Sequence, residues 1–370
     1  MIKIVSAVSN DIVTDNRVNK IAHSLEANGY KVTVVGRFLS TSIDLHERSY
    51  KTKRFKLLFN KGPLFYLNLN LRLFFYIAFS DFGFILANDL DTLPACFLAA
   101  KLKRKKIIFD SHELFSEVPE LVNRHFVRKI WLALEKFLIP KIDLGFTVSA
   151  SIAKYYENKY HVHFEVLRNV GHFRFDNEFA GVRKNLERTT IVYQGALNIG
   201  RGIELAIRSM KYIDNAELWI IGIGDIEEEL KLLVADLSLE SKVIFTGRIA
   251  LEDVWAYTFR ADIGLSLEED MGLNYRYALP NKLFDYIQAR LPVIVSDLPE
   301  MITIVDQYKI GKVLKERTPQ RLAEVIIEMI KNELPTGNYN AKVGLAAREL
   351  CWEREEDKLI DSVKQVCVYV

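Results

Sequence analysis

The stretch SLEEDMGLNYRYALPNKLFDYIQARLPVIVSDLPE, from Ser266 to Glu300, holds the strongest signals for both the fold and the site. It predicts a strand that ends near Leu267, then a loop, a helix opened by Pro280 and a second strand over Pro292–Ser296. Proline favours the first helical position because its missing N–H would have no partner there. A helix that begins beyond a strand's carboxyl end directs free N–H groups and partial positive charge toward the crevice where open α/β sheets bind ligands.

Asp285 lies about one turn into this predicted helix. A carboxylate so placed can accept hydrogen bonds from two vicinal hydroxyls, such as those of a ribose. Alternatively, Asp285 caps or charges the first turn of an ordinary helix. The spacing alone supports the two interpretations about equally.

The rest of the chain alternates predicted strands with predicted helices. In the first half the buried-type strands are Lys3–Val8, Lys31–Val35, Phe84–Ala87, Ile107–Phe109 and Leu144–Val148. In the second half they are Thr190–Tyr193, Leu218–Ile221, Val243–Phe245, Ile263–Leu267 and Val293–Val295. Such alternation predicts parallel sheets covered on both faces. We therefore expect an α/β protein of two Rossmann-like domains that face a cleft, with ligands at the carboxyl ends of the strands.

A polar stretch from Phe175 to Arg188 separates the two runs and sets the expected domain boundary between residues 172 and 188. The predicted organisation is an N-terminal domain over 1–175 and a C-terminal domain over 188–335. Residues 336–370 contain helix formers and no strand pattern, so we expect helices that pack back toward the N-terminal domain.

Composition sets the broad class. The chain has 370 residues, enough for two domains, and a net charge of +2, which gives no reason to expect a nucleic-acid partner. Its three cysteines match no metal or disulfide spacing. The first residues already form a strand, so we expect no signal peptide, and a reduced, cytoplasmic protein. No apolar run is long enough to span a bilayer.

Two turns of the second half are rich in glycine. Gly195, Gly200 and Gly202 let the backbone after one strand approach a ligand, and Arg201 between them suits phosphate oxygens through its planar fork. The alternative is a tight turn with an arginine that faces solvent. The turn over residues 222–225 resembles half of a dinucleotide fingerprint, and a lone G-x-G is weak evidence for one.

Two polar turns stand out in the first half. Asp15 precedes a predicted helix and is better interpreted as its N-cap than as a ligand-binding group. His112 follows a strand beside Asp110 and Glu113, whose negative charges favour the charged form of the histidine. His112 could act on a sugar or a phosphate, although a histidine in an acidic turn is more often a satisfied structural group.

Taken together, these motifs resemble a family, the retaining GT-B glycosyltransferases of the glycosyl transferases group 1 family. The resemblance runs from residue 1 to about residue 330 and is most specific in the stretch quoted first. The matching motifs, in chain order, are Asp15-Asn16-Arg17-Val18, Asp110-Ser111-His112-Glu113, Thr147-Val148-Ser149, Tyr193-Gln194-Gly195, Arg201-Gly202, Phe245-Thr246-Gly247 and Pro280-Asn281-Lys282-Leu283-Phe284-Asp285-Tyr286.

The resemblance implies a nucleotide-sugar donor held mainly by the second domain, a glycan or lipid-linked acceptor, and no metal or other cofactor. It implies catalytic roles for His112, at the donor sugar or reacting centre, and for Arg201, at the donor diphosphate. It implies that Asp285 binds the ribose hydroxyls. The further residues it assigns to the nucleotide sugar are Lys282, Asn281, Gly195, Gly200, Arg248 and Ser9.

Three positions depart from the family pattern. Tyr277 stands where many members have a second glutamate, Ala196 where many have an arginine, and Asp285 replaces a glutamate. These departures leave two alternatives to a sugar transferase open. One is a non-catalytic nucleotide-sugar or glycan-binding protein on the same scaffold, and the other is a GT-B sugar-nucleotide epimerase.

Residues 51–79 interleave basic with large apolar side chains. Lys51, Lys53, Arg54 and Lys56 precede an aromatic-rich segment, a pattern that can bind an anionic membrane surface. The alternative is a solvated strand followed by a core helix. The first interpretation predicts a cytoplasmic protein with peripheral contact at the inner face of the membrane.

Overall fold

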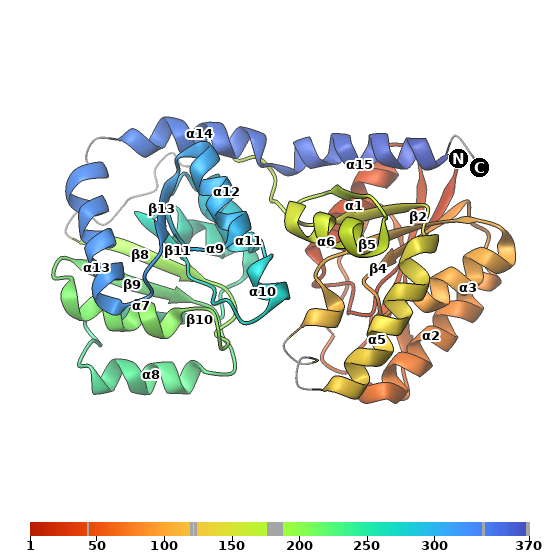
Figure 1. The fold of residues 1–370 in the computed structure, drawn as a ribbon, viewed down its shortest axis with the longest axis horizontal. Coiled ribbons are helices and arrows are strands. Elements are labelled where there is room, and N and C mark those ends of the chain that lie inside the picture. Colours follow the sequence, from red (N-terminus) through yellow and green to blue (C-terminus); the bar gives the residue numbers. More distant parts are fainter. Residues whose placement is uncertain (43, 119–120, 122–123, 176–187, 335–336, 368–370) are drawn as a thin grey trace. The chain divides into compact units, whose positions relative to one another are not determined.

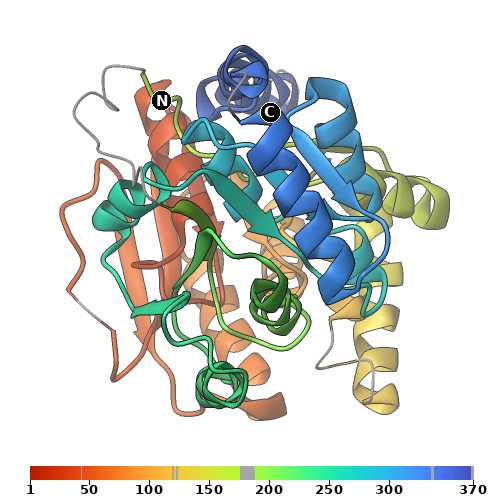
Figure 2. The same ribbon diagram turned by 90° about the vertical axis from the view of Figure 1, so that its left-hand side faces the viewer.

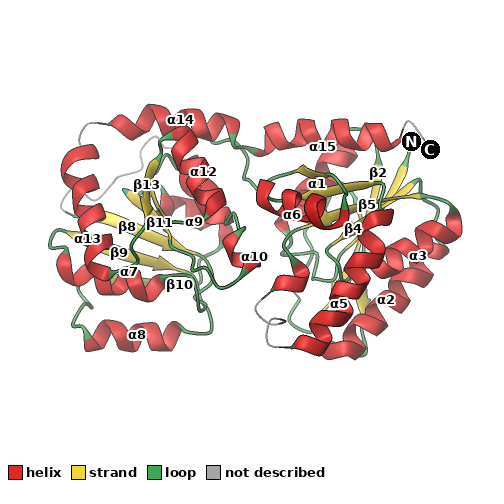
Figure 3. Cartoon of the chain, viewed as in Figure 1, coloured by secondary structure: helices red, strands yellow, loops and turns green. Residues whose placement is uncertain are grey.

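The computed structural model describes residues 1–42, 44–118, 121, 124–175, 188–334 and 337–367. The chain divides into two compact units: unit 1 is Met1–Asn169 with the C-terminal segment from Glu355, and unit 2 is Val170–Arg354. Both units alternate strands and helices, drawn yellow and red in Figure 3. The boundary predicted over residues 172–188 falls mostly outside the described residues.

The sheet of unit 1 has seven parallel strands in the order β3-β2-β1-β4-β5-β6-β7 (Figure 1). Central strands such as β4 are buried along their whole length, as expected for a parallel sheet covered on both faces. The strands are β1 (Lys3–Ala7), β2 (Lys31–Phe38), β3 (Lys51–Lys56), β4 (Phe84–Asn88), β5 (Lys106–Ser111), β6 (Leu144–Thr147) and β7 (Phe164–Val166).

Helices connect these strands, and most of the last helix of the chain also belongs to this unit. Asp15 caps the first of them by accepting a hydrogen bond from the Val18 N–H at 3.1 Å, which confirms the N-cap interpretation. The helices are α1 (Asn16–Ala27), α2 (Gly62–Ala78), α3 (Leu93–Lys103), α5 (His125–Leu138), α6 (Ala150–Tyr160) and α15 (Trp352–Cys367), with single 3₁₀ turns at Phe115–Glu117 and Ile139–Lys141.

The sheet of unit 2 has six parallel strands in the order β10-β9-β8-β11-β12-β13. Figure 2 turns this unit toward the viewer and shows helices against its strands. The strands are β8 (Thr189–Gln194), β9 (Ala216–Ile221), β10 (Val243–Gly247), β11 (Ile263–Ser266), β12 (Val293–Ser296) and β13 (Gly311–Leu314).

The helices of unit 2 lie on both faces of its sheet. Helix α7 contacts both α8 and α13 on one face, and α14 contacts α11 and α12 on the other. In chain order the helices are α7 (Ile203–Ser209), α8 (Glu227–Asp236), α9 (Leu251–Thr258), α10 (Leu273–Arg276), α11 (Asn281–Gln288), α12 (Pro299–Tyr308), α13 (Pro319–Glu328) and α14 (Asn338–Glu349), with a 3₁₀ turn at Met210–Tyr212 and a π turn at Met329–Glu333.

The predicted fold class, two parallel α/β sheets of Rossmann type, is confirmed. Two strands have no predicted counterpart, β7 and β13. Both are short edge strands, and β13 carries the weakly patterned sequence Gly-Lys-Val-Leu, so their pairing depends on the neighbouring strand rather than on a local signal.

Strand order reverses once in each sheet, between β1 and β4 in unit 1 and between β8 and β11 in unit 2. Connections on the two sides of such a point leave in opposite directions, so the loops beyond the strand carboxyl ends separate and leave room for a ligand. Ser9 follows β1 at one of these edges, and Gly195, Gly200 and Arg201 follow β8 at the other.

Candidate functional site

The loops after β8 and β9 form the floor of the site in unit 2. Gly195 has a φ of +134°, which side chains other than hydrogen rarely allow. A Cβ on Gly222 would lie 2.0 Å from the Gly195 carbonyl oxygen, so the two loops touch through their backbones. The glycines of the 222–225 turn therefore serve loop packing, which accounts for that G-x-G without a dinucleotide.

A buried ion pair lies above this floor. The Lys282 ammonium, on the first turn of α11, is 3.0 Å from Glu268 Oε1, and the two side chains are 8% and 0% exposed. Ser266 donates a hydrogen bond to the other oxygen of Glu268 at 2.8 Å. Lys282 Nζ also lies 3.9 Å from the centre of the Tyr193 ring. Two β11-end residues and one strand-β8 residue thus fix the position of this ammonium.

Burial and pairing act against each other on the pKa values of this pair. Burial alone would raise the pKa of Glu268, but Lys282 and the Ser266 hydroxyl lower it below its usual value. Burial lowers the pKa of Lys282, and Glu268 opposes that change. Within the described residues, neither Lys282 Nζ nor Glu268 Oε1 has a partner with hydrogen-bond geometry, so the contact is ionic and the ammonium can still donate hydrogen bonds.

Arg201 adds a second cation beside the same carboxylate. Its Nη1 is 3.9 Å from Glu268 Oε1, and its guanidinium lies 5.4 Å from the centre of the Tyr275 ring. The side chain is about one-third exposed, so the planar fork remains open to a ligand. Ala196, where an arginine is common in the family, contributes only its carbonyl, which accepts from Tyr193 at 2.8 Å. Arg201 and Lys282 are thus the two cations that lie beside Glu268.

Asp285 lies one turn along α11 and does not cap it. Pro280 occupies the N-cap position, one residue before the helix rather than at its first residue, and the first turn holds no acidic residue. Asp285 Oδ2 instead accepts a hydrogen bond from Gln194 Nε2 at 2.9 Å, and Gln194 Oε1 accepts from Thr258 at 2.7 Å. The interpretation of Asp285 as a helix cap is therefore wrong. Asp285 is instead a half-buried carboxylate that is hydrogen-bonded to Gln194 at the end of β8.

The other predicted residues of unit 2 lie around this group. Asn281 is the exposed first residue of α11. Gly200 precedes Arg201, and its carbonyl accepts from the Glu269 N–H at 2.8 Å. Arg248 follows β10, which β9 separates from β8, and its side chain is exposed. Glu268 was not predicted, although an acidic residue directly after a buried strand in the most informative stretch was a usable signal.

Unit 1 holds a second buried polar network at the ends of β4 and β5. Arg17 binds Asp110 with two hydrogen bonds of 2.9 and 2.6 Å, and both side chains are at most 3% exposed. A third bond from Arg17 reaches the Leu167 carbonyl at 2.8 Å. His112 lies between two carboxylates, with Nε2 3.2 Å from Asp110 and Nδ1 3.2 Å from Asp89.

His112 is therefore flanked by carboxylates, as predicted, but one of them comes from a different loop. Asp89, which has a φ of +58°, also accepts a bond from the His112 N–H at 2.9 Å. Asp89 was missed because it is 23 residues away in the sequence. Burial lowers the pKa of His112, but Asp89 and Asp110 outweigh it and raise the value to about 9. Arg17 and His112 hold the pKa of Asp110 well below its usual range despite its burial.

The raised pKa of His112 makes the stability of unit 1 depend on pH. The folded chain binds this proton more tightly than the unfolded chain, so the stabilisation is complete below pH 6.5 and is lost as the pH rises through about 9. We expect the free energy of unfolding to fall by about 3 kcal/mol across this interval. Urea unfolding at stepped pH measures the loss, and His112→Gln should flatten the profile. An equally steep profile in that variant would assign the titration to another group.

Ser9 follows β1, and its side chain hydrogen-bonds Asp91 at the end of β4. Asp91 lies just before α3 but does not cap it, because Thr92 occupies the N-cap position. Asp91 is buried, and its Oδ1 has no hydrogen-bond partner within the described residues.

Across the residues that the structure describes, no group of three or more histidine, cysteine, aspartate or glutamate side chains is arranged to hold a metal ion.

Comparison with known proteins supplies the family. Residues 15–170 match the model described as Glycosyltransferase Family 4, and residues 174–350 match the model described as Glycosyl transferases group 1. The chain is 26% identical, over 137 residues, to the amylovoran biosynthesis glycosyltransferase AmsK of Erwinia amylovora. That match covers 36% of this chain and 34% of AmsK, so the chain spans about one-third of the length of this curated relative.

Solved structures share the fold along the entire chain. Sucrose-phosphate synthase (tll1590) from Thermosynechococcus elongatus has a TM-score of 0.81 at 16% identity, covering 100% of both chains. Alr3699/HepE from Anabaena, in complex with UDP and glucose, has a TM-score of 0.76 at 13% identity, covering 99% of this chain and 100% of that one. The chain belongs to the glycosyl transferases group 1 family and is a glycosyltransferase of GT-B fold.

Proposed function

We propose that this enzyme transfers a sugar, with retention of its anomeric configuration, from a nucleoside diphosphate sugar to an acceptor hydroxyl in surface polysaccharide or glycolipid synthesis. The observation that carries the donor site is the buried Lys282 ammonium beside Arg201. It has hydrogen bonds left to donate at the sheet edge where α/β folds bind ligands. Diphosphate oxygens are acceptors that match these two cations in charge and geometry.

The remaining donor contacts follow from the positions of the side chains. Asp285 accepts hydrogen bonds from the two ribose hydroxyls while Gln194 holds its second oxygen. Gly195 and Gly200 bring backbone close to the diphosphate, and Asn281 adds the polar side chain at the start of α11. We also assign Arg248 and Ser9 to the nucleotide sugar, each as a contact outside the group formed by Lys282, Arg201 and Asp285.

The reaction breaks the bond between the anomeric carbon and the diphosphate oxygen and forms a bond to the acceptor oxygen on the same face. The acceptor proton passes to the leaving phosphate, so no carboxylate nucleophile of the glycosidase kind is needed. Arg201 and Lys282 stabilise the charge that develops on the departing diphosphate. We infer that no metal is needed for this step, since the two cations take the role that a metal takes elsewhere.

We assign His112 to the donor sugar or reacting centre. Its two ring nitrogens are not equivalent, because Asp110 is held by Arg17 while Asp89 is 18% exposed. Nε2 stays with Asp110, and Nδ1 is the nitrogen that can exchange Asp89 for a sugar hydroxyl. The raised pKa keeps the ring protonated near neutral pH, so it acts as a hydrogen-bond donor rather than as a general base.

Two relatives suggest where to begin with substrates. Alr3699/HepE binds UDP and glucose in its solved complex, which makes UDP-glucose the first donor to test. AmsK is named for amylovoran biosynthesis, which favours a glycan or lipid-linked acceptor.

Release of nucleoside diphosphate from a panel of nucleotide sugars, with and without acceptor, tests the proposal. A transferase releases it faster when an acceptor is present, and analysis of the product linkage establishes retention. An epimerase instead converts the sugar nucleotide, and a binding protein leaves it unchanged. Absence of acceptor-dependent release across the panel would contradict the proposal.

Asp285→Ala is expected to weaken donor binding by about 1.5–3 kcal/mol, the range for hydrogen bonds to a charged group. Titration calorimetry with the preferred nucleotide measures the loss. Asp225→Ala is a matched control, since Asp225 is an exposed carboxylate after β9 at the same sheet edge. Unchanged affinity in the Asp285 variant would remove Asp285 from the ribose site.

A further inference from the structure

Helix α2 is apolar on both of its faces. Its buried stripe consists of Phe65, Leu69, Leu73 and Ile77, at intervals of four residues. An opposite stripe faces solvent, in which Leu67, Leu71 and Phe75 are 56%, 48% and 55% exposed, and the exposed Leu64 and Phe79 extend it. A helix that is apolar all round is normally covered on all sides. A stripe of this kind marks a contact surface.

Two neighbouring helices, α3 and α5, also expose apolar side chains. Tyr66 of α2 contacts Trp131 of α5, with ring centres 5.0 Å apart, and Phe97 of α3 contacts Phe137 of α5 at 6.3 Å. Helix α3 also packs along α2. The exposed apolar side chains of α3 and α5 recur at helical spacing and are Leu98, Leu102, Phe126, Ile130 and Phe137. We call the solvent-exposed sides of α2, α3 and α5 the helical face.

The charge of the helical face is mainly positive, and the exposed Asp81 that follows α2 is paired with Lys3. Helices α2 and α3 contain no aspartate or glutamate, and the one carboxylate of α5, Glu135, is buried and bound by Lys159 and Tyr160. The exposed cations on and directly after these helices are Arg72, Lys101, Arg104, Lys105, Lys129, Lys136 and Lys141. The whole chain carries a net charge of only +2, so this excess is local.

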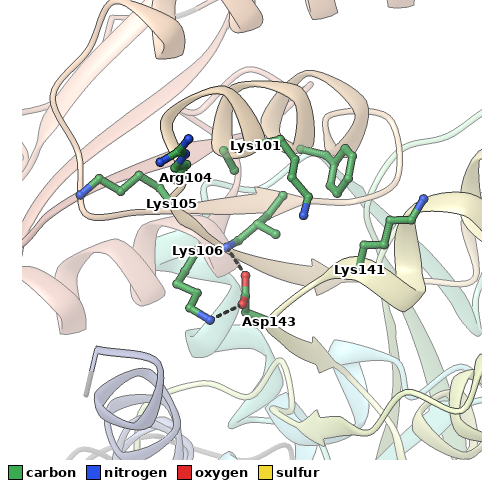
Figure 4. A pocket seen from close by; sticks show the side chains of 9 residues that line it. Lys101, Arg104, Lys105, Lys106, Lys141 and Asp143 are labelled. Atoms are coloured by element: carbon green, nitrogen blue, oxygen red, sulfur yellow. Dashed lines mark hydrogen bonds and ion pairs between the residues drawn. The ribbon is translucent and has the colours of Figure 1, made fainter. Parts of the chain in front are cut away.

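A basic pocket of about 310 Å³ opens between α3 and the start of β5 (Figure 4). Lys101 and Arg104 of α3, Lys105 and Lys106 before and in β5, and Lys141 after α5 line it. Its one carboxylate, Asp143, is 2.7 Å from Lys106 Nζ and also accepts from the Ile107 N–H, so four cations are left without an acidic partner in the pocket. The pocket lies at the amino end of β5, opposite the end that carries His112.

We propose that the helical face docks on an anionic lipid bilayer, with phospholipid phosphates in the basic pocket and the apolar stripes in the boundary between headgroups and acyl chains. Exposed leucine and phenylalanine flanked by lysine and arginine have the chemistry of interfacial membrane binding. In the described part of the chain, each helix is too short or too polar to cross a bilayer, so the contact is peripheral.

A second copy of the chain fits this surface poorly. A two-fold interface places each patch against its own copy, which would bring two basic faces together without intervening carboxylates. An anionic membrane supplies the missing negative charge over the whole face.

The sequence predicted membrane contact from the basic residues of strand β3. The structure gives their charge a different explanation. Strand β3 is the edge strand of its sheet, and charged side chains on an edge strand prevent pairing with another chain. Arg54 lies 3.7 Å from Asp11, and Lys51, Lys53 and Lys56 are exposed along that edge. Of residues 51–79, only the α2 part belongs to the helical face.

Vesicle co-sedimentation tests the docking without donor or acceptor, so its outcome does not depend on the proposed transfer reaction. The protein should pellet with vesicles in which roughly one-third of the lipid is phosphatidylglycerol, stay unbound with phosphatidylcholine alone, and dissociate as salt rises to about 0.5 M. No binding to the anionic vesicles at low salt would overturn the proposal.

Two independent variants locate the surface. Lys101→Gln with Lys105→Gln and Lys141→Gln should lower the vesicle partition coefficient about 100-fold, since each basic residue near such a surface contributes roughly fivefold. Leu67→Gln with Leu71→Gln and Phe75→Gln should lower it at least tenfold and leave the fold intact, because these side chains are already exposed. Lys51→Gln with Lys53→Gln and Lys56→Gln on β3 is the matched charge control and should bind as the wild type does.

Three outcomes would overturn the assignment to this face. Loss of binding in the β3 variant alone would move the membrane contact to that strand. Displacement from vesicles by inorganic phosphate, at constant ionic strength, would make the pocket a site for free anions. A dimer in sedimentation equilibrium that the face variants dissociate, with no vesicle binding, would make the face an interface between copies.

Discussion

Arg17→Met is expected to lower the free energy of unfolding of unit 1 by about 3–5 kcal/mol, the usual cost of leaving one member of a buried ion pair without its partner. Asp110 is fully buried and would lose the two charge-assisted hydrogen bonds that Arg17 donates. The Leu167 carbonyl would also lose the hydrogen bond that it accepts from Arg17. Hydrogen exchange of the β1 and β5 amides in urea measures this loss in unit 1 alone.

Two further variants serve as controls for the Arg17→Met result. Lys106→Met breaks a pair of similar length, 2.7 Å, whose side chains are 38% and 28% exposed, and should cost less than about 1 kcal/mol. Combining Arg17→Met with Asp110→Leu should recover part of the loss, because no uncompensated charge is then buried. A loss in Arg17→Met no larger than in Lys106→Met would show that Asp110 finds another partner.

Arg201→Ala is expected to lower kcat by about 100- to 1000-fold, the range for removing one donor from the group that stabilises charge in a transition state. Binding of the nucleoside alone should change little, since Arg201 acts on the diphosphate. Arg201→Lys should restore activity only in part, because lysine loses the planar fork. Steady-state kinetics together with titration of nucleoside and nucleoside diphosphate separates these effects.

Arg248→Ala is the control for charge at this edge of the sheet. Arg248 is exposed after β10 and forms no ion pair with a residue that the structure describes, so its removal should change kcat much less than that of Arg201. Equal losses of nucleoside and nucleoside diphosphate binding in Arg201→Ala would argue that the guanidinium only supports the loop.

Local signals in the sequence were sufficient for the architecture. Apolar runs marked the central strands, Asp15 marked the start of α1, and the stretch around Pro280 marked α11 to within one residue. These signals operate over a few residues, through period, capping and backbone restriction, so they can be recognised without knowing the fold. The weakly patterned edge strands β7 and β13 depend on their neighbours and were missed.

The composition of the polar sites was decided only by the tertiary structure. The sequence by itself identified His112, Arg201, Lys282 and Asp285 as polar groups at strand ends, and it determined the two-sheet fold that carries them. It did not show that Glu268 lies between Arg201 and Lys282, or that Asp89 completes the environment of His112. Electrostatic interactions act over a few ångströms in space irrespective of separation in the chain, so the partner of a buried charge becomes known only when the strands are placed side by side.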